Sequence, residues 1–368
     1  MSMTKIVFSE RIKQFPREKL KQWFRKNKRS FPWRENPTPY RVWVSEVMLQ
    51  QTRAEVVVNY FIEWMRKFPT IESLAAASED EVIKLWEGLG YYTRARNLLY
   101  GARMVMEEFG GIIPDNHLDL LLINGLGPYT VHAILAFAFK KKVAAVDGNV
   151  LRVISRVFLI ESSIDLESTK TWISRITQSL LPSRDPEVFS EALIELGACV
   201  CTRSPKCEVC PIRGVCGAAK EGKQAFLPVR HSRKKTVMLY RWAAIILYQG
   251  AIVLEHRKPQ EMMAGLYEFP YIEVESFEML SDTNTLTHAM EDRVGAQLVF
   301  CCDVAEQRHA FTYYKVRLIP KIFHAKSLPK SALLYSLDTI DALPFSSGHR
   351  KIKSWLLENI HTLVDDKV

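Results

Sequence analysis

The 368-residue sequence has no long apolar run. None of its hydrophobic stretches reaches the roughly 18 to 20 residues that a membrane-spanning helix needs, and the opening MSMTKIVFSERIKQF lacks the apolar core of a secretory signal peptide. It also has no internal repeat and no low-complexity tract. We therefore expect a globular protein in a reducing cytoplasm, where its seven cysteines do not form structural disulfides.

Acidic residues are scarcer than basic ones in this sequence. The chain has 41 Asp and Glu against 50 Lys and Arg, which gives a formal net charge of +9. An excess of positive charge favours a polyanionic partner, and nucleic acid is the first candidate. Because many basic proteins bind nothing anionic, the charge raises this expectation without deciding it.

The length allows two domains, and the hydrophobic period changes along the chain. Up to about residue 220, apolar residues recur at three- and four-residue spacing, which is typical of helices, and Ser78 with Glu81 has the spacing of a capping box. From about residue 237, β-branched and aromatic runs predict strands before a closing helix. We expect an all-α domain over 1–220, a basic linker over 221–236 and a smaller α+β domain over 237–368.

Four of the seven cysteines lie within sixteen residues, with the spacing Cys-x5-Cys-x2-Cys-x5-Cys: Cys201, Cys207, Cys210 and Cys216. Four thiolates on a short loop suit tetrahedral zinc or a cubane iron–sulfur cluster. Zinc ribbons usually have two Cys-x2-Cys knuckles, and this loop has one, so the spacing favours [4Fe–4S] over zinc and over four free thiols. The other cysteines are interpreted as ordinary core thiols: Cys199, Cys301 and Cys302.

Residues 120–139, LLLINGLGPYTVHAILAFAF, predict a helix, a tight Gly-x-Gly turn and a second helix. Gly125 and Gly127 can take positive φ, and Pro128 suits the first position of the second helix. The N-terminus of that helix has unpaired N–H groups and the positive end of the helix dipole, so a DNA phosphate fits there. The alternative is a helical hairpin that serves packing alone.

Two carboxylates have sequence surroundings that point to chemistry. Glu46 has Val42, Trp43 and Leu49 as its helical neighbours, so desolvation would raise its pKa toward neutrality; a solvated helix face is the alternative. Asp147 follows an apolar run and precedes a helix, where it is either a plain N-cap or a carboxylate that helix N–H groups keep ionised. Two carboxyl groups, one with a raised pKa that acts as the acid and one with a depressed pKa that stays an anion, are the pair that breaks a glycosidic bond.

Six motifs, in order, resemble those of the A/G-specific adenine DNA glycosylases, the MutY family of the helix-hairpin-helix superfamily to which endonuclease III belongs: FPWRENPTPYRVWVSEVMLQQT, WEGLGYYTRARNL, GLGPYT, VDGNV, FSEALIELGA and the cysteine loop. The resemblance implies a six-helix barrel core at about 30–140, an iron–sulfur loop at 201–216 and a C-terminal MutT-like (Nudix-like) domain. It also implies base excision repair, in which adenine opposite 8-oxoguanine or guanine is flipped out of duplex DNA and hydrolysed from its sugar.

The resemblance also implies roles for individual residues. Glu46 would protonate adenine N7, and Asp147 would stabilise the cationic sugar. Tyr129 stands where endonuclease III-like lyases have a Schiff-base lysine, so base release without efficient strand cleavage is expected. Other positions would support the site (Asn149, Glu191), line the adenine pocket (Trp33, Arg34, Leu49), wedge into the duplex (Gln51, Tyr91) or present the cluster loop to phosphate (Arg203, Lys206).

In the C-terminal domain, MMAGLYEFP (262–270) resembles the Nudix fold. In HAMEDRVG (288–295), Ala289 and Arg293 stand where the hydrolases have metal-binding Glu, so the resemblance implies a domain that reads 8-oxoguanine instead of hydrolysing nucleotides. The family's Phe-Ser-His loop, which would contact the lesion, has a counterpart here in Phe311, Thr312 and Tyr313.

The chain departs from the family in places. The first cysteine gap is x5 where x6 is usual, which leaves Cys199 as an alternative first ligand, and His132, where a small residue is usual, is interpreted as a helix histidine with a local partner. Three other functions stay open: an endonuclease III-like glycosylase and AP lyase, a non-catalytic iron–sulfur DNA-binding protein, and a nucleotide pyrophosphohydrolase. We expect a monomer that acts on double-stranded DNA at the nucleoid of a bacterial-type cytoplasm.

Overall fold

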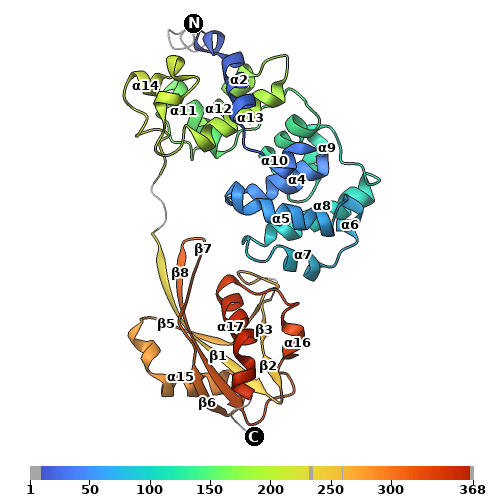
Figure 1. Ribbon diagram of the computed structural model, residues 1–368, viewed down its shortest axis with the longest axis vertical. Coiled ribbons are helices and arrows are strands. Elements are labelled where there is room, and N and C mark those ends of the chain that lie inside the picture. The colour runs from blue at the N-terminus through green and yellow to red at the C-terminus, as the bar shows by residue number, and fades with distance from the viewer. Residues whose placement is uncertain (1–9, 232–234, 259, 365–368) are drawn as a thin grey trace. The chain divides into compact units, whose positions relative to one another are not determined.

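The computed structural model describes residues 10–231, 235–258 and 260–364, so 232–234 of the expected linker lie outside it. The chain divides into two compact units, Met1–Ala76 with Asn97–Ser232, and Ala77–Arg96 with Arg233–Val368. The first unit consists of helices, and the second contains the β-sheet (Figure 1). The expected architecture, helices first and then a mixed α and β region, is confirmed.

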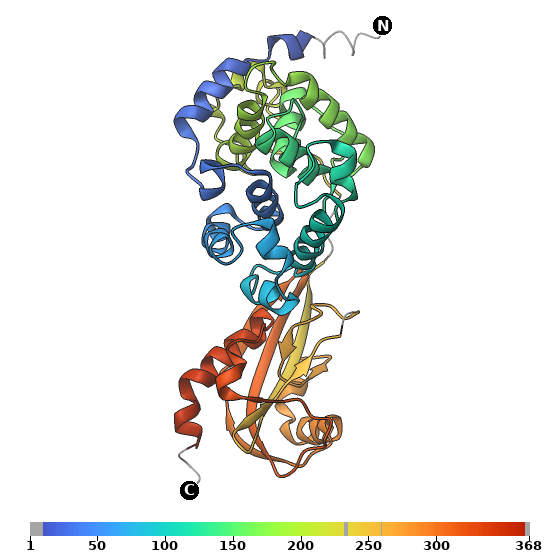
Figure 2. The ribbon, with the colours of Figure 1, turned by 90° about the vertical axis from the view of Figure 1, so that its right-hand side faces the viewer.

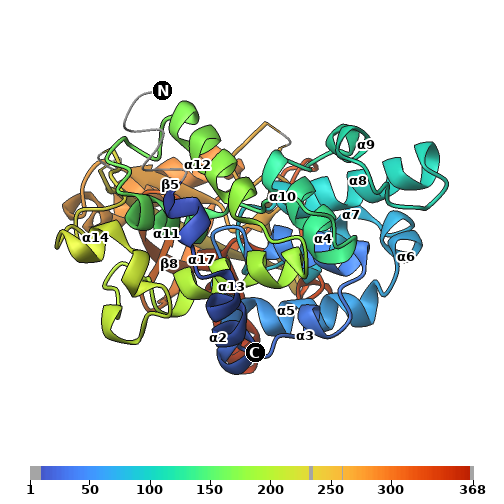
Figure 3. The same ribbon diagram turned by 90° about the horizontal axis from the view of Figure 1, so that it is seen from above.

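The helices of the first unit form two groups, which are labelled in Figures 1 and 3. One group packs around α11 and α13: α2 (Arg17–Asn27), α11 (Gly148–Phe158), α12 (Glu167–Leu180), α13 (Pro186–Cys199) and α14 (Gly217–Lys220). The other group packs around α4: α3 (Pro32–Glu35), α4 (Pro39–Leu49), α5 (Ala54–Lys67), α6 (Ile71–Ala75), α8 (Thr93–Glu108), α9 (His117–Leu122) and α10 (Pro128–Ala133). A further helix, α7 (Glu79–Leu85), lies in the 77–96 segment of the second unit.

Local sequence signals explain where several helices begin. Ser78 caps α7 as predicted, because its Oγ accepts from the Glu81 N–H at 3.3 Å while Glu81 Oε2 accepts from the Ser78 N–H at 3.1 Å. Thr38 caps α4 in a similar way, with its Oγ1 accepting from Arg41 N at 3.3 Å. The start of α4 fixes the rotation of that helix, and with it the direction in which Glu46 projects.

The predicted helical hairpin is present, with α9 and α10 joined by a tight turn. Gly125 has φ +81°, and a Cβ there would lie 2.4 Å from Asn97 Cβ, so only glycine fits. Gly127 differs from the prediction: as the N-cap of α10 it has φ −83° and ψ 167°, an extended conformation that any residue adopts. The next turn of α10 widens into a π-helical turn, η1 (Ile134–Ala138), and the partner of His132 Nδ1 is Ala144 O at 3.1 Å, which lies 12 residues later in the chain and is not the local partner expected.

The sheet of the second unit has the strand order β6-β8-β1-β2-β9, with β5 also paired to β1 and β7 to β8. Its strands are β1 (Val237–Tyr248), β2 (Ala251–Val253), β5 (Tyr271–Val274), β6 (Leu298–Asp303), β7 (Gln307–Phe311), β8 (Tyr314–Ala325) and β9 (Leu334–Ser336), and a separate pair is β3 (Glu255–His256) with β4 (Tyr267–Glu268). The central strands β1 and β8 run parallel, whereas the pairs β1–β2, β1–β5, β2–β9, β3–β4, β6–β8 and β7–β8 are antiparallel.

Helices cover both faces of this sheet (Figure 2). Along β1, Ala243, Ile245 and Leu247 pack in a core with residues of α16 (Leu337–Ile340) and α17 (Ser347–Val364). The alternate residues of β1, from Trp242 to Ile246, pack in a second core with residues of α15 (Thr283–Val294). The two-residue alternation of the strand therefore separates two hydrophobic cores.

Candidate active site

A pocket of about 1130 Å³ lies between the two helix groups of the first unit. Its lining comes from four places in the sequence: the 29–55 segment with α3 and α4, the turn before α10, the start of α11, and α13. The pocket contains most of the predicted site residues of this unit: Trp33, Arg34, Glu46, Leu49, Gln51, Gly125, Gly127, Tyr129, Asp147, Asn149 and Glu191. Trp33 and Glu191, 158 positions apart, are thus brought to one cavity, which is larger than the usual small-molecule site.

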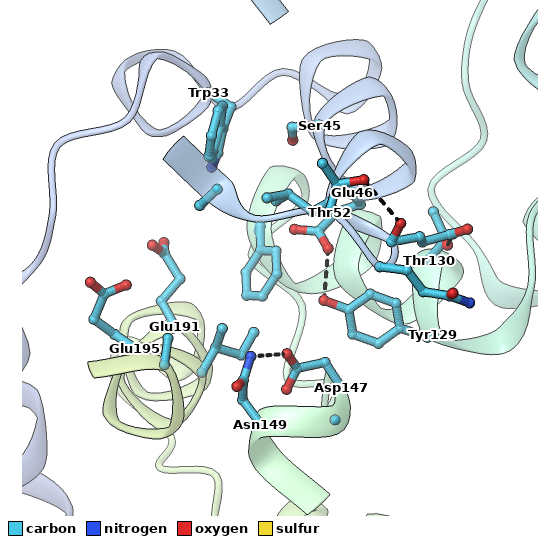
Figure 4. A pocket seen from close by; sticks show the side chains of 18 of the residues that line it. Trp33, Ser45, Glu46, Thr52, Tyr129, Thr130, Asp147, Asn149, Glu191 and Glu195 are labelled. Atoms are coloured by element: carbon cyan, nitrogen blue, oxygen red, sulfur yellow. Dashed lines mark hydrogen bonds between the residues drawn. The ribbon is translucent and has the colours of Figure 1, made fainter. Parts of the chain in front are cut away.

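Glu46 projects from α4 into this pocket and is 9 % exposed. The Tyr129 hydroxyl donates a hydrogen bond of 2.7 Å to Glu46 Oε2 (Figure 4). Desolvation raises the pKa of Glu46 to about 7, and the charges of Asp147 and Glu191 add to the rise, although the Tyr129 hydrogen bond opposes it. The predicted rise is confirmed, so this carboxyl can hold a proton near neutral pH.

Asp147 is the N-cap of α11, where its Oδ1 accepts from Val150 N at 2.8 Å. Its Oδ2 accepts from Asn149 Nδ2 at 2.6 Å (Figure 4). The predicted depression of its pKa is wrong. Burial raises the pKa of Asp147, and this effect outweighs the opposing hydrogen bonds from Val150 and Asn149 and the nearby charge of Arg152.

Arg152 connects the pocket to the cysteine loop. Its Nη2 donates to Asn149 Oδ1 at 2.7 Å, and its Nε donates to the carbonyl oxygen of Cys201 at 2.8 Å. Asn149 is thereby held from both sides, since it donates to Asp147 and accepts from Arg152. A movement of the first residue of the loop would reach the Asp147 carboxylate through two side chains.

Opposite Asp147, two carboxylates of α13 hold two arginines of the pocket wall. Arg34 pairs with Glu191 at 3.0 Å and with Glu195 at 2.9 Å, and Arg29 pairs with Glu195 at 2.7 Å. Trp33 is 7 % exposed and stacks on the ring of Phe31 at 4.6 Å. Trp33 and Arg34, two of the residues predicted to line the pocket, are therefore held in place by an aromatic ring and by two carboxylates.

Gln51 and Tyr91, the predicted wedge residues, share an unusual backbone conformation. Gln51 lines the pocket rim with φ +59°, and Tyr91 has φ +50° and 45 % exposure in the 77–96 segment of the second unit. Non-glycine residues rarely adopt positive φ, and such positions cluster at functional sites. The Arg94 guanidinium lies over the Tyr91 ring at 5.5 Å, so the ring is held although it is exposed.

In the sheet unit, the predicted lesion-reading residues form the tip of the β7–β8 hairpin. Phe311 pairs with Tyr314, and Thr312 at the turn is exposed with φ +49°. The Tyr313 and Tyr314 hydroxyls lie 2.9 Å apart, and the Phe311 ring contacts the Tyr314 ring at 5.3 Å. The Phe311 side chain also packs against the α17-side core, so it has a structural role whether or not it touches a lesion.

The four cysteines of the 201–216 loop converge. Burial raises the pKa of the Cys210 thiol to about 11, and the charges of Cys201, Cys216 and Cys207 add to the rise. The buried Arg156 guanidinium lies 3.3 Å from Cys201 Sγ, which places a positive charge beside the thiols.

Cys199 is not part of this set. Its Sγ lies 3.5 Å from Glu195 Oε1 of the same helix, α13, whereas the charges that raise the pKa of Cys210 come from Cys201, Cys216 and Cys207. Among the residues that the structure describes, no three His, Cys, Asp or Glu side chains are arranged around a single metal ion.

Sequence reasoning did not identify several charged residues that line the pocket, among them Arg29, Arg152, Glu195 and Arg230. Arg230 belongs to the expected linker, yet its neighbours are bonded to the helical unit, since Val229 O accepts from Ile164 N at 3.0 Å and His231 N donates to Asp165 Oδ2 at 2.7 Å. No local pattern marks these residues, because each reaches the pocket through partners distant in sequence.

Comparisons with known proteins agree with this site. Residues 44–179 match the family described as HhH-GPD superfamily base excision DNA repair protein, and residues 241–355 match the NUDIX domain. The chain is 32 % identical to the adenine DNA glycosylase of Buchnera aphidicola subsp. Baizongia pistaciae over 270 residues, which cover 73 % of this chain and 74 % of that protein. It is 38 % identical to the adenine DNA glycosylase of Rattus norvegicus over 271 residues, but these cover 69 % of this chain and only half, 50 %, of the rat protein.

Solved structures show the same fold in the helical unit. A thermostable thymine-DNA glycosylase aligns with a TM-score of 0.53 at 27 % identity, covering 58 % of this chain and 98 % of that one. A trapped endonuclease III–DNA covalent intermediate aligns with a TM-score of 0.50 at 20 % identity, covering 60 % of this chain and 99 % of that one. In the described part of the chain, no helix is both long and apolar enough to cross a membrane.

Proposed function

Because this chain belongs to the adenine DNA glycosylase family, we propose that it removes adenine opposite 8-oxoguanine or guanine from duplex DNA. One observation carries the proposal: a single pocket contains Glu46, with a pKa of about 7, and the Asp147 carboxylate, which Asn149 orients. A glycosidic bond breaks most readily between an acid that protonates the leaving group and an anion that faces the sugar cation.

The chemistry follows from the contacts of these groups. Tyr129 donates to Glu46 Oε2, which leaves Oε1 to carry the acidic proton. Glu46 would pass that proton to adenine N7, and the C1′–N9 electron pair would leave with the base. Asp147 would then face the cationic sugar until water adds to C1′ and loses a proton. The burial that raises both pKa values also strengthens these charge interactions.

Substrate binding would use the residues around the pocket. A flipped adenine would lie against Trp33, Arg34 and Leu49, with Glu191 holding Arg34 in place. Gln51 and Tyr91 would fill the gap that the base leaves in the duplex. The backbone at Gly125 and Gly127 would contact DNA phosphate, because no Cβ screens the N–H groups there.

Tyr129 decides between base release and strand cleavage. A lyase of the endonuclease III kind needs an amine at this position to form an imine with the sugar. Burial raises the pKa of Tyr129 far above its usual value, so it stays a neutral hydrogen-bond donor. The proposed product is therefore an abasic site in an intact strand.

The cofactor part of the proposal is a [4Fe–4S] cluster held by Cys201, Cys207, Cys210 and Cys216. The convergence of the four thiols and the buried Arg156 beside Cys201 support it, because a thiolate-bound cluster needs nearby positive charge. Such a cluster cross-links the loop when bound. Cys201 O would then hold Arg152 and so Asn149, while Arg203 and Lys206 of the loop face phosphate.

In the sheet unit, we assign lesion reading to the hairpin tip. Oxidation converts guanine N7 from an acceptor into an N–H donor, so a reader needs an acceptor, and the exposed Thr312 hydroxyl supplies one. Nucleotide hydrolysis is disfavoured because Arg293, at a position where the hydrolases have a metal-binding carboxylate, pairs with Glu255 at 2.7 Å. The monomeric state and the nucleoid location expected from the sequence belong to this same proposal.

The decisive experiment incubates the full-length, cluster-containing protein with duplexes that carry adenine opposite 8-oxoguanine, guanine or thymine, with and without alkali afterwards. Adenine release from the first two duplexes, with strand breaks only after alkali, supports the proposal. Strand breaks without alkali, together with borohydride trapping, would assign a lyase, and mismatch binding without release would assign a non-catalytic DNA-binding protein. Pyrophosphate release from nucleoside triphosphates would contradict the assignment of the sheet unit.

A further inference from the structure

Two adjacent cysteines, Cys301 and Cys302, lie in β6 at one end of the sheet's main path. Their sequence context predicts ordinary core thiols. In a regular strand, successive side chains point to opposite faces of the sheet. Neighbouring thiols in a regular β6 would therefore be separated by the sheet itself and could not act together.

A β-bulge in β6 removes this separation. Phe300 pairs with Phe323 of β8, and Cys302 pairs with the very next residue, Ile322, so Cys301 is an extra residue without its own partner. A bulge of this kind sets two residues of one strand against one residue of the other and interrupts the alternation of faces. Beyond the bulge, Asp303 pairs with Lys321, and regular pairing resumes.

Side-chain contacts on either side of the bulge show which face each residue takes. Before it, Leu298 belongs to the α15-side core, and the Phe300 ring contacts Phe323 of the same core at 5.8 Å. At the bulge, both Cys301 and Cys302 pack against the other core, on the α17 side. The two thiols therefore share one face of the sheet.

The two thiols are also in contact with each other. Burial raises the pKa of Cys302 to about 11, and a hydrogen bond and the charge of Cys301 add to the rise. Both side chains are half-buried and free of disulfides. They lie on an edge strand, so a small reagent can reach them without unfolding the sheet.

We propose that Cys301 and Cys302 form a redox modification site that reacts as a pair with a small-molecule disulfide, such as oxidised glutathione. Because burial raises the pKa of Cys302, the first attack is assigned to the Cys301 thiolate, which bonds to one sulfur of the reagent, forms a mixed disulfide and releases one small thiol. The second thiolate then displaces the remaining small thiol and forms the bond between the two cysteines. The protein loses two protons and two electrons, and the reagent gains both as it becomes two thiols.

Closure of this bond would be reversible and would disturb β6. Adjacent Cα atoms are about 3.8 Å apart across a trans peptide, closer than the usual roughly 4.4 to 6.8 Å of disulfide-bonded residues. A bond under such strain is easily reduced. Because the bulge would have to rearrange, the oxidised sheet unit should unfold at a lower temperature than the reduced one.

The test uses the full-length, cluster-containing protein. Trypsin releases residues 294–308, between Arg293 and Arg308, as one peptide that contains both cysteines and no other. After treatment with oxidised glutathione and alkylation of remaining thiols, we expect this peptide to lack two hydrogens and to have neither glutathione nor alkyl groups. Dithiothreitol should restore it. Cys301→Ser and Cys302→Ser should each retain glutathione on the remaining cysteine, and Cys199→Ser, the control at another half-buried thiol, should behave as wild type.

Phenylarsine oxide gives a second readout, because it binds two neighbouring thiols together. We expect wild type to bind one equivalent more than either serine variant. A wild-type peptide that keeps one or two glutathiones, or that stays reduced while the urea-unfolded chain closes the bond, would overturn the proposal. Equal arsenical binding by wild type and both variants would overturn it as well. None of these outcomes depends on adenine release.

Discussion

The pocket of the helical unit and the β7–β8 hairpin of the sheet unit hold their candidate functional residues in opposite ways. In the pocket, Glu46 is nearly buried, Asp147 accepts two hydrogen bonds, and the wall arginines are paired with carboxylates. At the hairpin tip, Thr312 is exposed, and only Phe311 packs into a core. The pocket is held together by its own contacts, whereas the hairpin tip presents an exposed hydroxyl.

The difference matches what each task requires. An acid with a pKa near 7 exists only where burial and neighbouring charges are already in place, so the chemical site has to be built into a folded pocket. Recognition of a base in a duplex needs a protruding side chain, which contributes binding energy only when it contacts the DNA. The strained φ of +49° at Thr312 keeps that side chain at the apex of the turn.

The largest effect is expected from Glu46→Gln. The amide oxygen can still accept from Tyr129, so the pocket should stay intact, but no proton can be transferred to the leaving base. Single-turnover adenine release should fall about 10²–10⁴-fold, while mismatch binding survives. Glu63→Gln, on the exposed Glu63–Arg66 pair of α5, is the matched control. A rate within about threefold of wild type would show that Glu46 is not the acid.

Asp147→Asn separates charge from structure. Asparagine caps helices as well as aspartate, so α11 should keep its start, whereas the sugar cation loses its facing anion. We expect single-turnover release to fall on the order of 10²–10³-fold. Asp282→Asn makes the same change at the N-cap of α15 and should leave release unchanged. If Asp147→Asn lowered thermal stability but preserved the rate, a capping role alone would remain.

Changes at the hairpin should affect selectivity and spare the chemistry. Phe311→Ala with Thr312→Ala should lower the 8-oxoguanine:guanine ratio of release rates by about five- to 150-fold, the range of one base contact. Thr312→Gly also removes the hydroxyl but relieves the positive φ, so it should lose selectivity while gaining thermal stability. An unchanged ratio with lower stability in the double variant would leave Phe311 as a core residue only.

The pH profile follows from the raised pKa of Glu46. The protonated form of Glu46 is the active one, so single-turnover release should fall roughly tenfold for each pH unit above about pH 7. On the acid side release should fall again, because burial raises the pKa of Asp147 and protonation removes the anion that faces the sugar cation. Glu46→Gln should lack the alkaline limb, because it has no proton to lose there. A wild-type rate that rises between pH 7 and 8 would assign a base, not an acid, to the rate-limiting step.

The smallest effect is expected from Arg230→Ala. Arg230 lines the pocket, and its neighbours Val229 and His231 are hydrogen-bonded to Ile164 and Asp165; in the proposed complex its anionic partner is a phosphate. The slope of log affinity against log salt should become shallower by about one, with little change in single-turnover release. Arg66→Ala, on the exposed face of α5, is the control. An unchanged slope would leave Arg230 outside the DNA contact.

Much of this fold and site is predictable because its determinants are local. Apolar spacing predicts the helices. Ser78 and Glu81, three positions apart, predict a capping box, and the apolar neighbours of Glu46 predict its raised pKa. The turn at Gly125 is equally local in its sequence, although its need for glycine comes from Asn97, 28 residues earlier. Each of these predictions depends on residues within a few positions of one another.

The element types, the helix caps, the cysteine spacing and the residue types at the site can therefore be predicted from short stretches of sequence. Three features depend on the folded chain: burial of Asp147 outweighs its hydrogen bonds, Arg230 reaches the pocket, and a bulge turns Cys301 and Cys302 to one face. The physical reason is that desolvation and charge–charge energies depend on everything packed around a group. Those neighbours come from distant parts of the chain, and no short stretch of sequence specifies them.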